Sequence, residues 1–294
     1  MEKVIIHLHY LMRYIMEQNN LFDLYKEEDF NFAENTTIKY GEIYKLGRHY
    51  LMCGNATNLS DVIKLMNNNK ADMIFADPPY NVAIGSKNKS IKDVTGQKSN
   101  SITEDIIGDS GMTDEEIGKL LWQPAFKNMK AIAKDCCGIY VTMPQGGAHM
   151  MMMMMMMSSS WQVKHELIWV KNSPTFSMGR LDYDYQHEPI CYGWNKSVKH
   201  IKKGKYNKSV WFFDKPLKSN LHPTMKPIPL IINAIENSSE PDDIIVDLFG
   251  GSGSTLIACE QTNRICYMME LDPKYVQTII NRYEIFAKRK AIKI

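Results

Sequence analysis

The sequence has no long apolar run, few cysteines and little net charge. No stretch approaches the roughly 18 consecutive apolar residues that a membrane-spanning helix needs, so we expect no membrane partner. The six cysteines form no CxxC pair and show no metal-ligand spacing. This excludes a disulfide framework or zinc site and predicts buried or reduced thiols in an intracellular protein. A net charge of only +2 indicates no partner by itself.

The N-terminal segment does not have the pattern of a secretory signal. Charged residues such as Lys3 and Arg13 interrupt its apolar residues, and no small-residue cleavage site follows. Its apolar residues recur at helical spacing, at Ile5, Leu8, Met12 and Ile15. We therefore expect residues 1–40 to form a helix followed by an acidic tether, and residues 41–294 to form the compact domain.

The rest of the chain alternates between helix-like segments and short apolar strands. A hairpin is expected over residues 43–53. The pattern predicts helices over 59–66, 114–133, 227–236, 254–261 and 273–288, and strands over 73–76, 138–143, 165–170, 244–248 and 265–269. The methionine run 150–157 is expected to be helical, because methionine is a good helix former. Repeated strand and helix predict an α/β fold, a mostly parallel doubly wound sheet with helices on both faces.

A Gly-rich turn, VDLFGGSGST at 246–255, follows one predicted strand. Gly250, Gly251 and Gly253 let a ligand approach the backbone closely, and the next helix presents unpaired N–H groups. The following strand ends in Glu270, whose carboxylate can accept hydrogen bonds from both hydroxyls of a ribose. A Gly-rich turn followed by an acid at the end of the next strand is typical of proteins that bind adenosine-containing cofactors. Alone it does not separate a dinucleotide from S-adenosylmethionine, and a tight turn without a ligand is the plainer alternative.

Another predicted strand ends in the tetrapeptide Asp77-Pro78-Pro79-Tyr80, within ADMIFADPPYNV at 71–82. Two consecutive prolines hold the backbone rigid and leave the Pro78 carbonyl oxygen as a directed acceptor. A strand-ending turn with a surface tyrosine would explain the prolines. It would explain neither the acid nor the aromatic side chain.

From about residue 40 the sequence resembles the DNA amino-methyltransferase family, which modifies adenine N6 or cytosine N4. The motifs are GRHYLMCGNA at 47–56, DPPY at 77–80, WVKN at 169–172, YQHEPICYGW at 185–194, HPTMKP at 222–227 and DLFGGSGST at 247–255. Their order is that of the β group of this family. The resemblance implies a Rossmann-like S-adenosylmethionine-dependent methyltransferase sheet with a DNA-recognition insertion at about 171–220, of restriction–modification or prophage type.

The resemblance also implies methyl transfer from S-adenosylmethionine to an amino group in double-stranded DNA, with adenine N6 preferred. Asp77 and the Pro78 carbonyl would accept the amino hydrogens and align the nitrogen for in-line attack. Tyr80 would stack on the flipped base. Thr224 and Lys226 would bind the methionine carboxylate of the cofactor. The complete implied cofactor site is Asn55, Thr224, Lys226, Asp247, Phe249, Gly250, Gly251, Ser252, Gly253, Thr255 and Glu270.

One position departs from the family pattern. Family members usually carry an acid where this chain has Asn55, a position expected near the adenine of the cofactor. An asparagine side chain can still accept a hydrogen bond there and can also donate one. We therefore expect altered cofactor affinity and retained activity.

Lysines gather in two polar segments of the chain. Residues 196–218 contain many lysines and aromatic residues but a single acid, Asp214. Such a segment favours phosphate contacts, although a solvated basic surface is the alternative. We expect the loop at 86–98 to close over bound DNA. The predicted DNA-contacting residues are Lys87, Lys89, Lys199, Lys202, Lys203 and Lys205.

Three other functions stay open. Cytosine-N4 methylation uses the same geometry, although in the family Asp at position 77 favours adenine. Methylation of RNA or of a glutamine side chain usually goes with Asn at that position. A DNA-binding protein that has lost catalysis is the alternative from a different class, and the intact Asp77–Tyr80 and Gly250–Glu270 segments argue against it.

The remaining expectations concern metals, partners and location. His187 and His222 are interpreted as structural, because no third or fourth ligand lies at metal spacing. By family analogy, a second copy of the chain and a cognate restriction endonuclease are candidate partners. The expected location is the cytoplasm of a bacterial or phage-infected cell.

Overall fold

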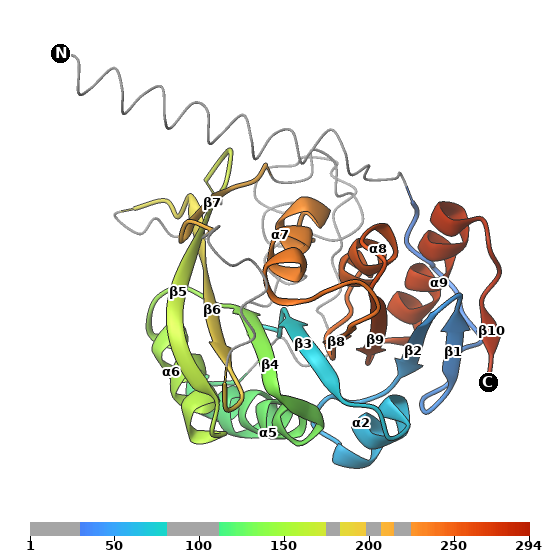
Figure 1. Ribbon diagram of the computed structural model, residues 1–294, viewed down its shortest axis with the longest axis horizontal. Helices are drawn as coiled ribbons and strands as arrows, with labels where there is room; N and C mark the ends of the chain where they lie inside the picture. The colour runs from blue at the N-terminus through green and yellow to red at the C-terminus, as the bar shows by residue number, and fades with distance from the viewer. Residues whose placement is uncertain (1–29, 81–111, 175–182, 198–206, 215–224) are drawn as a thin grey trace.

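A ten-stranded sheet runs through the computed structural model, which describes residues 30–80, 112–174, 183–197, 207–214 and 225–294 (Figure 1). Its strands are β1 (Ile43–Leu46), β2 (His49–Cys53), β3 (Ala71–Ala76), β4 (Ala133–Thr142), β5 (Gln162–Val170), β6 (His187–Trp194), β7 (Val210–Phe212), β8 (Ile244–Asp247), β9 (Ile265–Glu270) and β10 (Ile292–Lys293). Their order across the sheet is β10-β1-β2-β9-β8-β3-β4-β6-β5-β7.

The centre of the sheet is parallel, as the sequence predicts. β2, β9, β8, β3 and β4 pair in parallel, one after the other. β1 and β2 form the predicted antiparallel hairpin. β6 lies antiparallel between β4 and β5. Consequently the carboxyl ends of the parallel strands and the beginning of β6 meet at the same edge of the sheet.

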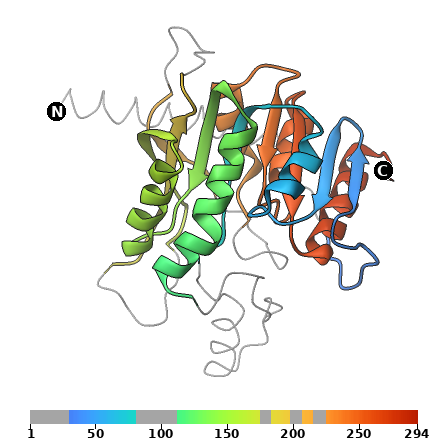
Figure 2. The same cartoon turned by 90° about the horizontal axis from the view of Figure 1, so that it is seen from below.

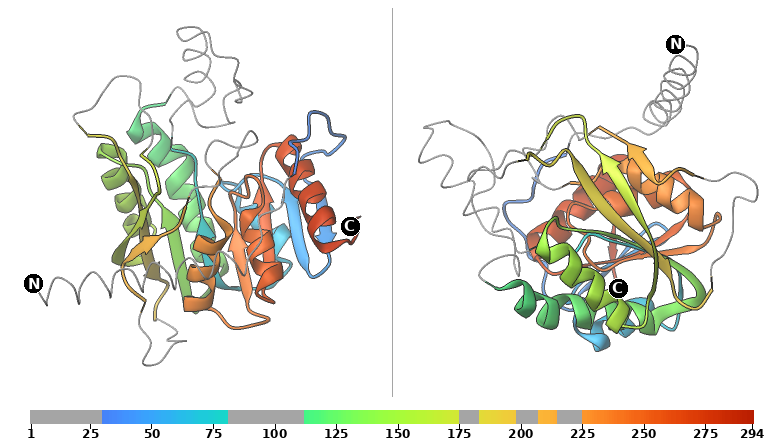
Figure 3. Two further views of the ribbon diagram at one scale, coloured as in Figure 1. Left: turned by 90° about the horizontal axis from the view of Figure 1, so that it is seen from above. Right: turned by 90° about the vertical axis from the view of Figure 1, so that its left-hand side faces the viewer.

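Helices cover both faces of the sheet, which confirms that prediction. They are α2 (Leu59–Met66), α4 (Asp114–Ile117), the π-helix η1 (Gly118–Trp122), α5 (Gln123–Ile132), α6 (Gly147–Ser158), α7 (Ile228–Ser238), α8 (Ser254–Gln261) and α9 (Pro273–Ala287). Seen from below, α2, α5 and α6 lie in front of the strands (Figure 2). From above, α7, α8 and α9 lie in front (Figure 3).

Each face has its own buried core. Ile231 and Leu256 belong to the cluster beneath α7, α8 and α9, whereas Phe126 belongs to the cluster beneath α2, α5 and α6. Fully burying one such side chain stabilises the fold by about 1.5–3 kcal/mol. The methionine run is helical, as expected. Met152 and Met156 are buried in it, whereas Met150, Met154 and Met157 are exposed. Helices in the described part of the chain are too short or too polar to span a membrane.

All six cysteines are free thiols, and five of them are buried. Cys136 is partly exposed. The prediction of buried or reduced thiols is therefore confirmed, with five buried thiols and a partly exposed free thiol at Cys136.

The antiparallel strand β6 is the main departure from the expected elements. The sequence assigns it to the recognition insertion at 171–220, but β6 is an inner strand of the sheet. Pro189 and Gly193 make this strand hard to recognise in the sequence, because both residues are unusual within strands. Gly193 is required there, since a Cβ atom would lie 2.2 Å from the carbonyl oxygen of Gln162. β7 also lies in that range.

The N-terminal boundary also differs from the expected one. From Phe30 onward the chain packs against α9 and does not form a free tether. Phe30 and Ala33 are buried, and the Ala33 amide donates to Oγ1 of Thr278 over 3.0 Å. The Phe32 ring meets the Tyr275 ring edge-on, with centroids 4.8 Å apart. The amphipathic helix predicted further upstream lies outside the described residues.

Candidate active site

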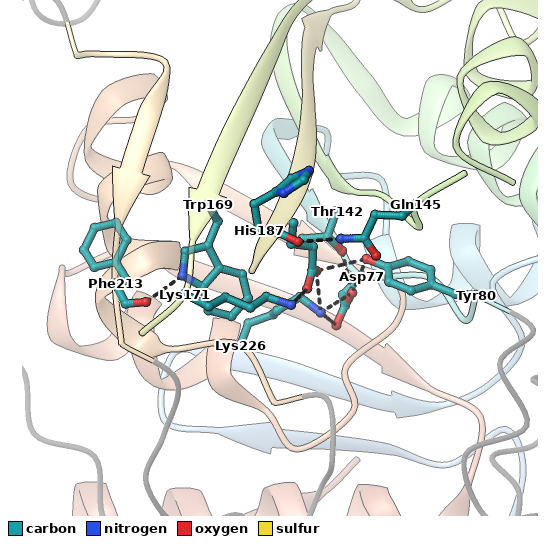
Figure 4. Close-up of polar contacts among 10 residues, drawn as sticks. Asp77, Tyr80, Thr142, Gln145, Trp169, Lys171, His187, Phe213 and Lys226 are labelled. Carbon is teal, nitrogen blue, oxygen red and sulfur yellow. Dashed lines mark hydrogen bonds and ion pairs between the residues drawn. The ribbon is translucent and has the colours of Figure 1, made fainter. Parts of the chain in front are cut away.

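Several polar side chains converge where the strands of the sheet end. Asp77 follows β3, Thr142 ends β4 and Asp247 ends β8. Lys171 follows β5, and the antiparallel β6 delivers Glu188 to the same edge. Figure 4 shows Asp77, Tyr80, Thr142, Lys171 and Lys226 turned toward one another in this region.

The Asp77 carboxylate is held by three side chains. Nζ of Lys226 lies 2.7 Å from each of its two oxygens. The hydroxyl of Thr142 donates to Oδ1 of Asp77, and the Tyr80 hydroxyl donates to the same oxygen over 3.1 Å. The orientation of this carboxylate is therefore fixed from several directions.

Glu188 connects Lys226 to a second buried lysine. Its Oε1 lies 3.1 Å from Nζ of Lys226, and its Oε2 lies 2.8 Å from Nζ of Lys171. Burial raises the pKa of the Glu188 carboxyl, but the two ammonium groups outweigh burial and hold that pKa below its usual value. Burial likewise lowers the pKa of Lys226, while Asp77 and Glu188 more than offset it and raise that pKa. Both shifts favour the charged forms of Glu188 and Lys226.

The diproline segment is fixed from the side of η1. Trp122, fully buried at the end of this π-helix, donates its ring N–H to the Pro79 carbonyl over 3.0 Å. Pro78 is buried. The Tyr80 hydroxyl oxygen also lies 3.2 Å from Oε1 of Glu188, so its one hydrogen is shared between Asp77 and Glu188. Nζ of Lys226 lies 5.6 Å from the centre of the Tyr80 ring. Tyr80 therefore links the backbone turn to the charged groups.

The Gly-rich turn is tied to three neighbouring elements. The Phe249 amide donates to Oδ1 of Asp247 over 2.9 Å, and the Gly251 amide donates to Oε2 of Glu270 over 2.8 Å. From α9, Nη1 of Arg282 donates to the Ser252 carbonyl over 3.0 Å. Gly253 has a φ of +86°, in the left-handed region that favours glycine.

Two acids beside this turn titrate near neutral pH. Burial raises the pKa of Asp247 to about 7, against hydrogen bonds from the Thr255 side chain and the Phe249 amide. Burial also raises the pKa of Glu270 to about 7, against the amides of Asp272 and Gly251. Either carboxyl can therefore change charge within the working range of an enzyme.

One pocket joins the DPPY segment to the Gly-rich turn. It is lined by Phe75, Asp77, Met225, Lys226, Ile231, Asp247, Phe249, Gly250, Gly251, Ser252, Ser254 and Thr255. The two motifs are far apart in the sequence, and the parallel pairing of β3 with β8 brings them together. Lys226 contributes to both the pocket and the charged cluster.

Asn55 lies on the loop after β2, next to the end of β9. The adjacent Gly54 amide donates to the Glu270 carbonyl over 3.0 Å. Oδ1 of Asn55 accepts hydrogen bonds from both the amide and the hydroxyl of Thr57, each over 2.9 Å. The backbone N–H of Asn55 donates to Oδ2 of Asp61 over 3.0 Å. The Asn55 side chain therefore shapes a tight turn at the rim of the site.

Several predicted site residues lie outside the described residues. They are Thr224, His222, the 86–98 loop and the lysines Lys87, Lys89, Lys199, Lys202, Lys203 and Lys205. The His187 carbonyl accepts a hydrogen bond from the Gln145 side chain, and its ring contacts the Tyr185 ring. Within the described ranges, no group of three or more His, Cys, Asp and Glu side chains could hold a metal ion.

Four residues of the site have no role in the sequence-based prediction. They are Trp122, Thr142, Lys171 and Glu188. Lys171 lies in the WVKN motif and Glu188 in the YQHEPICYGW motif. The motifs therefore single out both residues but do not indicate what either residue does. Thr142 and Trp122 stand in no motif, and only the folded chain places them beside Asp77 and Pro79.

Known proteins resemble this chain in sequence. A family model described as DNA methylase matches residues 71–282. The type II methyltransferase M.HinfI of Haemophilus influenzae is 24% identical over 239 residues, which cover 75% of this chain and 65% of that protein. The match therefore spans just under two thirds of M.HinfI. The type II methyltransferase M2.MboI of Moraxella bovis is 24% identical over 249 residues, 77% of this chain and 85% of that protein.

Solved structures share the fold. The PvuII DNA methyltransferase, described as cytosine-N4-specific, has a TM-score of 0.57 at 14% identity, covering 83% of this chain and 90% of that one. The M1.HpyAVI–SAM complex has a TM-score of 0.53 at 21% identity, covering 76% and 96%. The family model spans most of this chain, including both the DPPY segment and the Gly-rich turn, and the protein therefore belongs to the DNA methylase family.

Proposed function

We propose that this protein is a DNA methyltransferase that transfers the methyl group of S-adenosylmethionine to adenine N6. The observation that carries the proposal is the single pocket shared by Asp77, Lys226 and the Gly-rich turn. Membership in the DNA methylase family supports it, as do relatives named type II methyltransferases. A structure of similar fold, M1.HpyAVI, is titled as a complex with SAM.

The pocket and the strand end and loop beside it have suitable groups for each part of the methyl donor. Glu270, at the end of β9, would accept hydrogen bonds from the ribose hydroxyls, and Asn55 on the neighbouring loop would lie near the adenine. Lys226 would pair with the methionine carboxylate, together with Thr224 by family resemblance. Gly250 and Gly251 line the pocket without side chains, so their backbone can approach a ligand closely. When bound, the donor supplies a methyl group activated by a sulfonium.

Asp77 and the Pro78 carbonyl would act on the target base. The lone pair of an aromatic amino group is delocalised into the ring, so the nitrogen is a poor nucleophile. Hydrogen bonds from its two hydrogens to Asp77 and Pro78 would favour a localised lone pair directed at the methyl group. Tyr80 would stack on the base, which must leave the duplex because its amino group is otherwise paired.

Cytosine N4 is the second candidate target. The PvuII enzyme of similar fold is described as cytosine-N4-specific, and a cytosine amino group presents the same hydrogens to the same acceptors. We favour adenine because Asp at position 77 goes with adenine in the family that the sequence resembles. The same resemblance underlies the proposed homodimer, the cognate endonuclease and the bacterial or phage-infected cell as the location. The proposed phosphate contacts of the lysines at 87–89 and 199–205 rest on how these lysines cluster in the sequence.

The test uses unmethylated DNA and S-adenosylmethionine. After incubation the DNA is digested to nucleosides, and the modified base is identified by mass spectrometry, with Asp77→Ala as the inactive control. N6-methyladenine supports the proposal, and N4-methylcytosine moves the target to the second candidate. Retained donor binding without any modified base contradicts both and favours a non-catalytic DNA-binding protein.

A further inference from the structure

Lys226 has two anionic partners within the charged cluster. Its ammonium lies 2.7 Å from both oxygens of Asp77 and 3.1 Å from Oε1 of Glu188. The residue is only 5% exposed, and it also lines the pocket formed with the Gly-rich turn. One buried cation therefore stands between the catalytic carboxylate and the proposed donor site.

Lys226 occupies both oxygens of Asp77 in this arrangement. A carboxylate offers about four lone-pair sites, two on each oxygen. Oδ1 of Asp77 accepts from Lys226, Thr142 and Tyr80, whereas Oδ2 accepts from Lys226. The amino hydrogen of a base would therefore compete with Lys226 at either oxygen. Lys226 and Tyr80 both also reach Oε1 of Glu188, but of the two only Lys226 lines the pocket formed with the Gly-rich turn.

Glu188 is anchored on the side away from Asp77. Nζ of Lys171 lies 2.8 Å from Oε2 of Glu188, and both side chains are about nine-tenths buried. Lys171 also lies 4.9 Å from the centre of the Trp169 ring, and the ring N–H of Trp169 donates to the Phe213 carbonyl over 2.7 Å. These contacts tie Glu188 to β5 and to the end of β7, as Figure 4 shows for the labelled partners.

We propose that Glu188 and Lys171 form a positioning pair that holds Lys226 while it exchanges Asp77 for the carboxylate of the methyl donor. Asp77 is thereby released for the base only when the donor is in place. Glu188 is needed because a buried ammonium that leaves one partner requires a second counter-charge during the exchange. Lys171 is needed because it offsets the charge of Glu188 and keeps it from holding Lys226 too tightly. The inference rests on the proposed function, since it uses the same donor pocket.

The test measures the affinity for S-adenosylmethionine by calorimetry in Glu188→Gln, Lys171→Met and the double variant. Glu188→Gln removes one of the two carboxylates that contact Lys226. Its donor affinity and kcat should each fall about tenfold, because one charge-assisted hydrogen bond is lost, while KM for DNA stays unchanged. Lys171→Met removes one of the two ammonium groups that contact Glu188 and should also weaken donor binding. Glu166→Gln, at an exposed position of β5, is the matched control and should change nothing.

The double variant separates positioning from folding. It keeps the net charge of the cluster, so it should fold even if a single variant does not. If Lys171 acts through Glu188, the donor affinity of the double variant equals that of Glu188→Gln. The proposal is overturned if the loss of donor affinity in the double variant equals the sum of the losses in the two single variants. It is also overturned if the single variants have a lowered melting temperature and an unchanged donor affinity.

Donor binding also distinguishes this inference from the proposed function. If the wild-type protein binds the donor but methylates no base, the proposed function fails. The donor affinities of the variants still test whether Glu188 and Lys171 position Lys226. If the wild-type protein does not bind the donor, both fail.

Discussion

The Gly251 amide donates to Oε2 of Glu270 over 2.8 Å, and this bond joins the Gly-rich turn to the end of β9. The Asp272 amide donates to the other oxygen of Glu270 over 2.9 Å. Burial nevertheless raises the pKa of Glu270 from 4.5 to about 7. The state of this one carboxyl therefore affects both the fold and the proposed ribose contact.

Donor affinity should rise as the pH increases through about 7. Below that pH Glu270 is protonated and accepts hydrogen bonds less well, so it holds the ribose hydroxyls more weakly. Glu270→Gln should weaken donor binding about tenfold at pH 8 and flatten the pH profile, leaving only the contribution of Asp247, whose pKa is also about 7. Calorimetric titrations between about pH 5.5 and 8.5 measure this. An unchanged profile in the variant would remove Glu270 from the donor site.

The same shift predicts how stability depends on pH. The folded-state pKa of Glu270 lies above its unfolded value, so the native state binds the proton more tightly between about pH 4.5 and 7. The contribution of this group to the free energy of unfolding is full below that window and is lost as the pH rises through it. Glu270→Gln should reduce the loss. Urea unfolding of the two proteins at about pH 5 and pH 8 provides the comparison.

Thr142→Val should lower kcat about tenfold with little change in donor affinity. The Thr142 hydroxyl donates to Oδ1 of Asp77, and valine has nearly the same shape without the donor. A hydrogen bond to a charged group contributes about 1.5–3 kcal/mol. Thr142→Ser, which keeps the hydroxyl, is the control and should stay within about twofold of wild type. Equal rates for the valine and serine variants would contradict this role.

Gly253→Ala should destabilise the protein by about 2–3 kcal/mol and weaken donor binding. Its φ of +86° disfavours a side chain, and a Cβ atom would lie 3.1 Å from two side-chain carbons of Ile279. Gly41 has a similar φ of +85°, and a Cβ there would meet Nζ of Lys64 at an ordinary 3.9 Å. Gly41→Ala is thus a control for the cost of placing a side chain at a positive φ. Denaturant unfolding and donor titration of both variants test the difference, and equal donor affinities would contradict it.

The parts of the site that could be predicted depend on patterns among neighbouring residues. Asp77 and Asp247 each follow an apolar strand and open a turn, so strand and turn patterns together place them at one sheet edge. The hairpin at 43–53 and the helical methionine run follow from equally local patterns.

The parts that could not be predicted depend on pairings between distant segments. Glu188 reaches Lys226 because β6 enters the sheet antiparallel, and its Pro189 and Gly193 hide that strand in a periodicity search. Arg282 belongs to an ordinary amphipathic pattern in α9, yet its guanidinium lies 4.4 Å from the centre of the Phe30 ring and supports the Gly-rich turn. No local signal in the sequence indicates either contact.

Asn55→Asp should tighten donor binding about three- to tenfold. Oδ1 of Asn55 accepts from Thr57, and aspartate preserves both of those hydrogen bonds, so the turn should remain intact. A carboxylate would also accept more strongly from the amino group of the donor adenine, since charge-assisted hydrogen bonds are about twice as strong as neutral ones. Asn55→Ala, the companion variant, loses the Thr57 bonds and should destabilise the fold by about 1 kcal/mol. Donor affinity that is equal in wild type and Asn55→Asp would show that this loop only shapes the rim, and that the departure from the family pattern has no effect on the cofactor.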